Sequence, residues 1–115
     1  MILDEAVLHR QVGGPAVMAQ QLARLSEATT WPQVVIQVLP FSCGANAGIE
    51  GHFVMLSFGT IEDPPVAYVE GLMGDVYIEA ADEVDGFNLA WTYLVSQALD
   101  PAESAAMIRA STKEQ

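Results

Sequence analysis

The first half of the chain carries two different hydrophobic patterns. In residues 15–28, Met18, Leu22 and Leu25 recur at spacings of four and three, and the proline that opens the segment suits the first turn of a helix. This pattern predicts an amphipathic helix over residues 15–28. Residues 2–10 fit either a short strand or a helical turn, and both interpretations stay open.

Apolar residues then alternate with a period of two, as they do in strands. β-Branched residues dominate residues 34–39, and a proline ends the segment. Residues 53–58 are apolar on both faces, which predicts a central strand that is covered on both sides. Residues 66–70 and 75–79 predict two further strands, joined by a turn over residues 71–74.

Two helices are predicted at the end of the chain. The first has an apolar stripe with Trp91 near its centre, so we expect Trp91 to lie in the core and Asp82 to cap the helix. The stripe consists of Val84, Phe87, Trp91, Leu94 and Ala98. Alternatively, Phe87, Trp91 and Tyr93 could line a pocket against the sheet. The second helix is predicted to begin after Asp100, a capping residue, with Pro101 in its first turn and Glu103 at the capping-box position.

These elements together predict the α+β class. Four successive strands followed by helices favour an antiparallel sheet of about four strands with the helices packed on one face. A length of 115 residues fits one domain, so we expect residues 1–115 to form a single domain. A hydrophobic content of 51% allows that domain to bury a core without a metal or a disulfide.

Charge narrows the classes of function. Four Lys and Arg face fifteen Asp and Glu, which gives a formal net charge of -11. Such a surface repels phosphates, so we exclude direct nucleic-acid binding by this chain. The chain has no apolar run as long as a membrane span, and acidic residues stand where a signal peptide is basic. We therefore expect a cytoplasmic protein with no membrane partner.

The most suggestive polar residues fall on the predicted hairpin. Period-two alternation places Tyr68 and Glu70 on one face of the first strand, and Asp75, Tyr77 and Glu79 on one face of the second. Either plausible turn register brings the two sets onto the same side of the sheet. Together they could bind a cationic or hydroxylated ligand, or hold a carboxylic acid with a raised pKa. The same face could also be a solvated outer surface.

Three other residues are weaker candidates. Glu5 stands among apolar residues, so we expect it to be half-buried and count it as a ligand-binding candidate. A carboxylate that simply stabilises the start of a helix would explain its position equally well. Cys43 and His52 flank a glycine-rich loop and could form a thiolate and its base, or could be incidental to a flexible connection. The two histidines lack metal-ligand spacing, so we expect neither a metal nor a cofactor.

Nearly the whole chain resembles a known family. The segments that carry the resemblance are LDEAVLHRQVGGPAVMAQQLARL (3–25), VVIQVLPF (34–41), CGANAGIEGHFVMLSF (43–58), VAYVEGLMGDVYIE (66–79) and LDPAESAAMI (99–108). They resemble the C-terminal domain of unknown function that follows the DNA-binding helix-turn-helix in many actinobacterial XRE-type transcription regulators, the WhiJ-like proteins.

The resemblance implies the sensing or protein-interaction half of a regulator of development or specialised metabolism. Its partner would be a small molecule or a small acidic protein. Met1 stands where this domain begins, so we expect no helix-turn-helix in this chain, which would be either an excised domain or a free-standing copy.

Three functions follow from these observations. The leading hypothesis is a non-enzymatic domain that binds a ligand or a partner and acts as the sensor of a transcription regulator. The second is a free-standing biosynthetic protein, such as a cyclase or isomerase-like enzyme of specialised metabolism, that uses an apolar cavity between the sheet and the helices. The third is a structural module that forms a homodimer.

Overall fold

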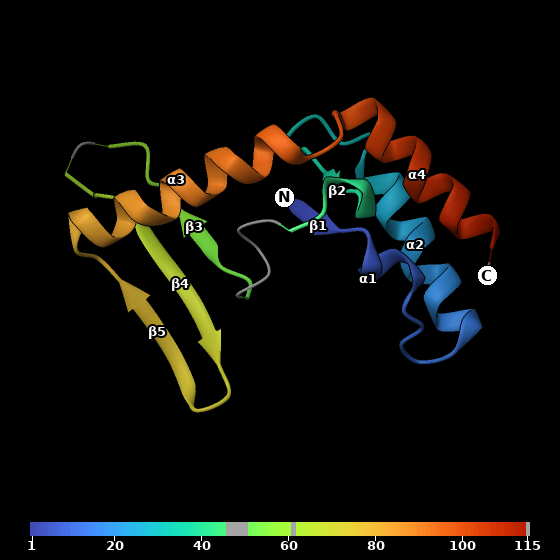
Figure 1. Cartoon of the computed structure of the whole chain (residues 1–115), viewed down its shortest axis with the longest axis horizontal. Helices are drawn as coiled ribbons and strands as arrows, with labels where there is room; N and C mark the ends of the chain where they lie inside the picture. Colours follow the sequence, from blue (N-terminus) through green and yellow to red (C-terminus); the bar gives the residue numbers. More distant parts are fainter. Residues whose placement is uncertain (46–50, 61, 115) are drawn as a thin grey trace. The chain divides into compact units, whose positions relative to one another are not determined.

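The computed structural model describes residues 1–45, 51–60 and 62–114. Its internal contacts divide the chain into two compact units (Figure 1). Unit 1 comprises residues 1–44 and 97–115, and unit 2 comprises residues 45–96. Each unit combines helices with strands, so the predicted α+β class is confirmed.

Unit 1 is built mainly from helices. Its elements are β1 (Ile2–Asp4), α1 (Ala6–His9), α2 (Pro15–Ala28), β2 (Gln37–Leu39), the 3-10 helix η1 (Phe41–Cys43) and α4 (Pro101–Lys113). The N-terminal segment forms both a strand and a helical turn, and α2 has the predicted bounds. The predicted cap of α4 is confirmed, because the Glu103 N–H donates to Asp100 Oδ1 at 2.7 Å.

The prediction that β2 joins the antiparallel sheet is wrong. β2 pairs in parallel with β1, with Val38 opposite Leu3. The other edge of β2 is occupied, because the Val38 N–H donates to Ser104 Oγ at 2.9 Å and the Val38 carbonyl accepts from the Leu99 N–H at 2.9 Å. The start of α4 therefore fills the edge where a further strand would pair.

The core of unit 1 lies among its helices and β2. Figure 1 shows α2, in blue, running beside α4, in red. The buried side chains of this core are Leu8, Met18, Leu22, Ile36, Val38 and Ile108. The apolar stripe that predicted α2 is thus the face that packs inward.

Unit 2 contains an antiparallel sheet and a long helix. Its elements are β3 (Val54–Leu56), β4 (Val66–Gly71), β5 (Gly74–Ile78) and α3 (Ala81–Gln97), whose last residue belongs to unit 1. The sheet has three strands in the order β3-β4-β5, not the four that were predicted. The hairpin over residues 66–79 is confirmed, with Tyr68 opposite Tyr77.

β3 is an edge strand, so the prediction of a covered central strand is wrong. Among the strands that the structure describes it pairs with β4 alone, and Val54 and Leu56 are 44% and 41% exposed. Only the alternate residues Phe53 and Met55 are half-buried. Apolar side chains on both faces of a short segment do not determine whether a second strand is available to pair with it.

Two expectations for α3 also need correction. The helix begins at Ala81, so Asp82 lies inside its first turn rather than at the cap. Trp91 is 38% exposed and does not lie in the core, whereas Val84 and Leu94 are buried. The reason is one of size: a helix of 17 residues is about 25 Å long, and three short strands cannot cover its whole apolar stripe.

Within the part of the chain that the structure describes, no helix is long and apolar enough to cross a membrane.

Candidate functional site

Unit 2 contains an open pocket of about 600 Å³. It is lined by Gly51, His52, Phe53, Val69, Glu70, Glu83, Gly86, Phe87 and Ala90. These residues come from the segment that leads into β3, from β4 and from α3. The volume falls in the range of small-molecule sites, about 300–1,000 Å³.

The walls of the pocket are apolar. The rings of Phe53 and Phe87 meet edge to face, with centroids 5.2 Å apart and planes inclined by 62°. Val69 adds an apolar wall from β4 and Ala90 one from α3. Aromatic pairs of this geometry give a pocket a defined shape, because each ring restricts the orientation of the other.

A glycine opens the pocket on the side of α3. Gly86 lies within the helix and lines the pocket, and a Cβ built there would meet no atom within 4 Å. A glycine inside a helix is about 1 kcal/mol less favourable than an alanine. The helix thus carries a destabilising residue at a point where the absence of a side chain leaves open space.

The rim of the pocket is polar. Glu70 comes from β4 and Glu83 from the first turn of α3. His52 Nε2 lies 3.8 Å from Glu70 Oε2, and both side chains are more than half exposed. The pocket therefore has two carboxylates and one imidazole where its apolar walls meet solvent.

Glu70 also connects the pocket with the polar face of the hairpin. The Tyr68 hydroxyl donates to Glu70 Oε1 at 3.1 Å, and the Tyr68 and Tyr77 rings lie 4.9 Å apart. Partial burial, together with hydrogen bonds to Asp75 and Glu70, raises the pKa of Tyr68 well above its usual value of 10.0. Tyr68 is therefore a hydrogen-bond donor at neutral pH, and it orients one oxygen of Glu70.

The five candidate residues from the sequence do not all come together. Tyr68, Tyr77 and Glu70 form one cluster on the hairpin. Glu79 is exposed and follows the end of β5 at Ile78. Glu5 belongs to unit 1.

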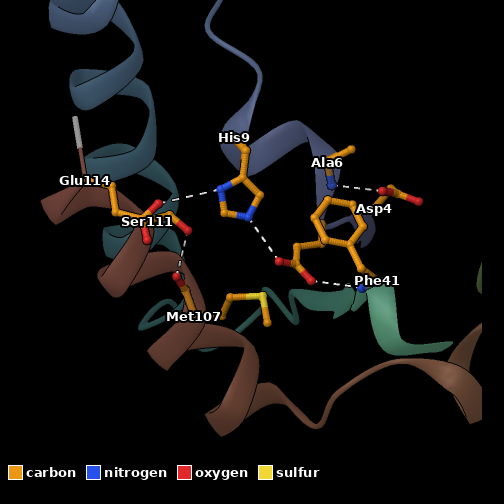
Figure 2. A network of polar contacts seen from close by, with 8 residues as sticks. Asp4, Ala6, His9, Phe41, Met107, Ser111 and Glu114 are labelled. Carbon is orange, nitrogen blue, oxygen red and sulfur yellow. Dashed lines mark hydrogen bonds and ion pairs between the residues drawn. The ribbon is translucent and has the colours of Figure 1, made fainter. Parts of the chain in front are cut away.

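Glu5 is half-buried, as expected, and its carboxylate is engaged within unit 1 (Figure 2). Its Oε1 accepts from the Phe41 N–H at 2.9 Å, and its Oε2 lies 3.0 Å from His9 Nε2. The His9 ring stacks on Phe41, and His9 Nδ1 lies 3.6 Å from Glu114 Oε2. These contacts connect α1, η1 and the end of α4, so the role of Glu5 is structural.

Both interpretations of Cys43 and His52, a thiolate with its base or two residues incidental to the connection, stay predictions. Cys43 is half-buried at the end of η1 in unit 1, whereas His52 belongs to unit 2, and residues 46–50 of the loop lie outside the described residues. Among the residues with described positions, no group of three or more His, Cys, Asp or Glu is arranged to hold a metal ion.

Sequence reasoning missed most of the pocket. It favoured a core position for Phe87 over a place in the lining of a pocket, and it did not single out Glu83 or Gly86. Gly86 was the available signal, because a glycine inside a helical pattern is about 1 kcal/mol less favourable than an alanine and therefore marks an unusual position.

The fold is of the α+β class, and unit 2 has an open pocket whose volume falls in the range of small-molecule sites. Residues 1–110 match the family described as "Domain of unknown function (DUF5753)", and the chain belongs to this family. No curated protein and no solved structure gives a match.

Proposed function

We propose that the chain is a non-enzymatic sensor domain of a cytoplasmic transcription regulator, and that it binds a small molecule in the pocket of unit 2. Its resemblance to domains that follow the helix-turn-helix of actinobacterial XRE-type regulators supports this role. The DNA-binding function would then belong to a helix-turn-helix outside these residues.

The observation that carries the proposal is the open space beside Gly86. An alanine at this position would favour the helix, since a helical glycine loses more backbone entropy on folding, and its methyl group would occupy only a small part of the space. The glycine instead leaves room between α3 and the aromatic pair of Phe53 and Phe87. Because no side chain extends from this position of α3, the helix leaves space that a ligand can occupy, and only a side chain much larger than a methyl group would fill it.

Charge favours a small molecule over an acidic protein as the partner. All four Lys and Arg stand at positions 10, 24, 109 and 113, outside unit 2. An acidic protein that docked at the pocket would meet Glu70 and Glu83 with no Lys or Arg nearby in the sequence of unit 2. Like charges brought together in this way oppose binding.

α3 offers a route from the ligand to the rest of the regulator. Its first turns carry Glu83, Gly86 and Phe87 of the pocket, and its last residue, Gln97, belongs to unit 1. We infer that a ligand which stabilises these turns changes the stability of the same helix at its end in unit 1.

Two substitutions of Gly86 test the proposal. Gly86→Ala should stabilise the protein by about 0.5–1 kcal/mol and should leave the pocket open, because a methyl group occupies little of it. Gly86→Leu should fold as well as Gly86→Ala but fill the pocket. We expect phenylpropanol and phenylpropylamine, followed by protein NMR titration, to bind the wild type and Gly86→Ala, and to bind Gly86→Leu at least about tenfold more weakly.

The mapping of the chemical-shift changes is part of the test. Changes centred on Phe53, Val69 and Phe87 would support the pocket as the binding site. Equal binding by all three proteins, or changes centred in unit 1, would show that the pocket is not the ligand site.

A further inference from the structure

We propose that the pocket of unit 2 selects organic cations, namely a protonated amine attached to an aromatic or otherwise apolar body. The inference rests on the proposed ligand-binding function of this pocket and adds the chemical class of its ligand.

The charge of the chain is concentrated in unit 2. The sequence of residues 45–96 contains nine of the fifteen Asp and Glu and none of the four Lys and Arg. Its only basic side chain is His52. An excess of one sign around a concave site with low-dielectric walls raises the local concentration of ligands of the opposite charge.

Two of these carboxylates line the pocket from different elements. Glu70 is supplied by β4, and Glu83 by the first turn of α3. An ammonium group has three N–H donors and can satisfy more than one carboxylate at once. The Tyr68 hydroxyl donates to Oε1 of Glu70, whereas Oε2 lies 3.8 Å from Nε2 of His52.

The walls suit the body of such a ligand. The rings of Phe53 and Phe87, which meet edge to face, line the pocket together with Val69 and Ala90. A ring or a short alkyl chain would bury its surface there, and a cation near the face of an aromatic ring gains a further electrostatic attraction. A carboxylate ligand would instead face Glu70 and Glu83 across the same opening.

Three probes that share one aromatic body separate charge from shape. We expect phenylpropylamine to bind at least about tenfold more tightly than phenylpropanol at low salt, and phenylpropanoate to bind most weakly. Isothermal titration of the full chain, with NMR mapping, measures all three. Equal affinities for the amine and the alcohol would overturn cation selectivity but leave the proposed ligand-binding function intact. Absence of binding by every probe would overturn both.

A matched pair of variants assigns the selectivity to the pocket. Glu83→Gln should weaken the amine about fivefold to tenfold and leave the alcohol unchanged. Asp82→Asn removes a neighbouring carboxylate from the same first turn of α3 without touching the pocket lining, so it should change both affinities by less than about twofold. Equal effects of the two variants would show that overall charge, and not the pocket carboxylate, attracts the amine.

Discussion

Glu5 is a single carboxylate that connects three elements of unit 1. One oxygen accepts from the backbone of η1, the other lies beside His9 of α1, and His9 in turn lies beside Glu114 at the end of α4 (Figure 2). The side chain of Glu5 is only 16% exposed. Hydrogen bonds to a charged acceptor are stronger than those between neutral groups, so the ionised form of Glu5 is the form that stabilises the contacts among these three elements.

The pH dependence of stability should report this contact. The hydrogen bond from the Phe41 N–H, followed by the contact with His9, lowers the pKa of Glu5 below its usual value of 4.5. A carboxyl group whose pKa is lower in the folded state stabilises the fold above its unfolded pKa, and this contribution is lost as the pH falls through the folded pKa. Glu5→Gln should therefore cost about 1 kcal/mol near neutral pH, and the difference from the wild type should shrink as the pH falls below 4.5.

Urea unfolding at a series of pH values measures this difference. Glu27→Gln is a suitable control, because Glu27 is 59% exposed and pairs only with Arg24 on the surface of α2, so its loss should cost less than about 0.5 kcal/mol. A cost of Glu5→Gln that stays constant from neutral to acidic pH would contradict the role given to the carboxylate.

At the scale of elements, β2 depends on α4 as much as on β1. The backbone of Val38 bonds to Ser104 Oγ on one strand edge, and Ser104 is fully buried. The residue before the helix cap, Leu99, completes the same edge through its own N–H. A serine in the first turns of a helix thus substitutes for a neighbouring strand.

Ser104→Ala should therefore lower the free energy of unfolding clearly, although it removes a single hydroxyl group. It leaves the N–H of Val38 buried without an acceptor, which costs about 1–3 kcal/mol. Ser111→Ala is the matched control: Ser111 is also buried on α4, but it donates only to the Met107 carbonyl of its own helix, and its removal should cost less than about 0.5 kcal/mol. Thermal and urea unfolding of the two variants compare them, and equal losses would contradict the role of Ser104 at the strand edge.

Elements with local determinants could be predicted from the sequence. The bounds of α2, the cap of α4 and the turn between β4 and β5 follow from a starting proline, a capping aspartate and two glycines. The shared face of Tyr68 and Tyr77 also follows, because the strand period places both side chains on the same side of the sheet in either turn register. These features depend on residues close together in the chain.

Features that depend on distant residues could not be predicted. The parallel partner of β2 lies 35 residues away from it, at Leu3 opposite Val38. The pocket needs Phe53 and Phe87 to meet, and the exposure of Trp91 depends on how far a three-stranded sheet extends beneath α3. Hydrophobic periodicity shows which face of an element is apolar, but not which element covers that face.

At the scale of the whole molecule, the two units differ sharply in charge. Unit 1 contains six Asp and Glu and all four Lys and Arg, whereas unit 2 contains nine Asp and Glu and no Lys or Arg. Almost the entire net charge of -11 thus comes from the unit that holds the pocket. The charge that attracts a cationic ligand to unit 2 is the same charge that repels a phosphate backbone.

The chain by itself should therefore not bind DNA. Protein–DNA affinity depends on Lys and Arg that neutralise phosphates and release counterions. Of the few basic residues, Arg24 pairs with Glu27 at 3.1 Å and stacks over Trp31 at 4.8 Å, so its charge is already partly neutralised. Fluorescence anisotropy with a labelled duplex at about 100 mM salt should show no binding by the chain.

The remaining basic residues of α4 provide the decisive variant. Arg109 and Lys113 are one helical turn apart and line the same shallow surface of unit 1. If the chain did bind a duplex, a double substitution of Arg109→Gln and Lys113→Gln should remove that binding, and rising salt should weaken it steeply. Salt-sensitive binding that disappears in this variant would show that unit 1 contacts phosphates despite the acidity of the chain, and the assignment of DNA recognition to a separate helix-turn-helix would then be wrong.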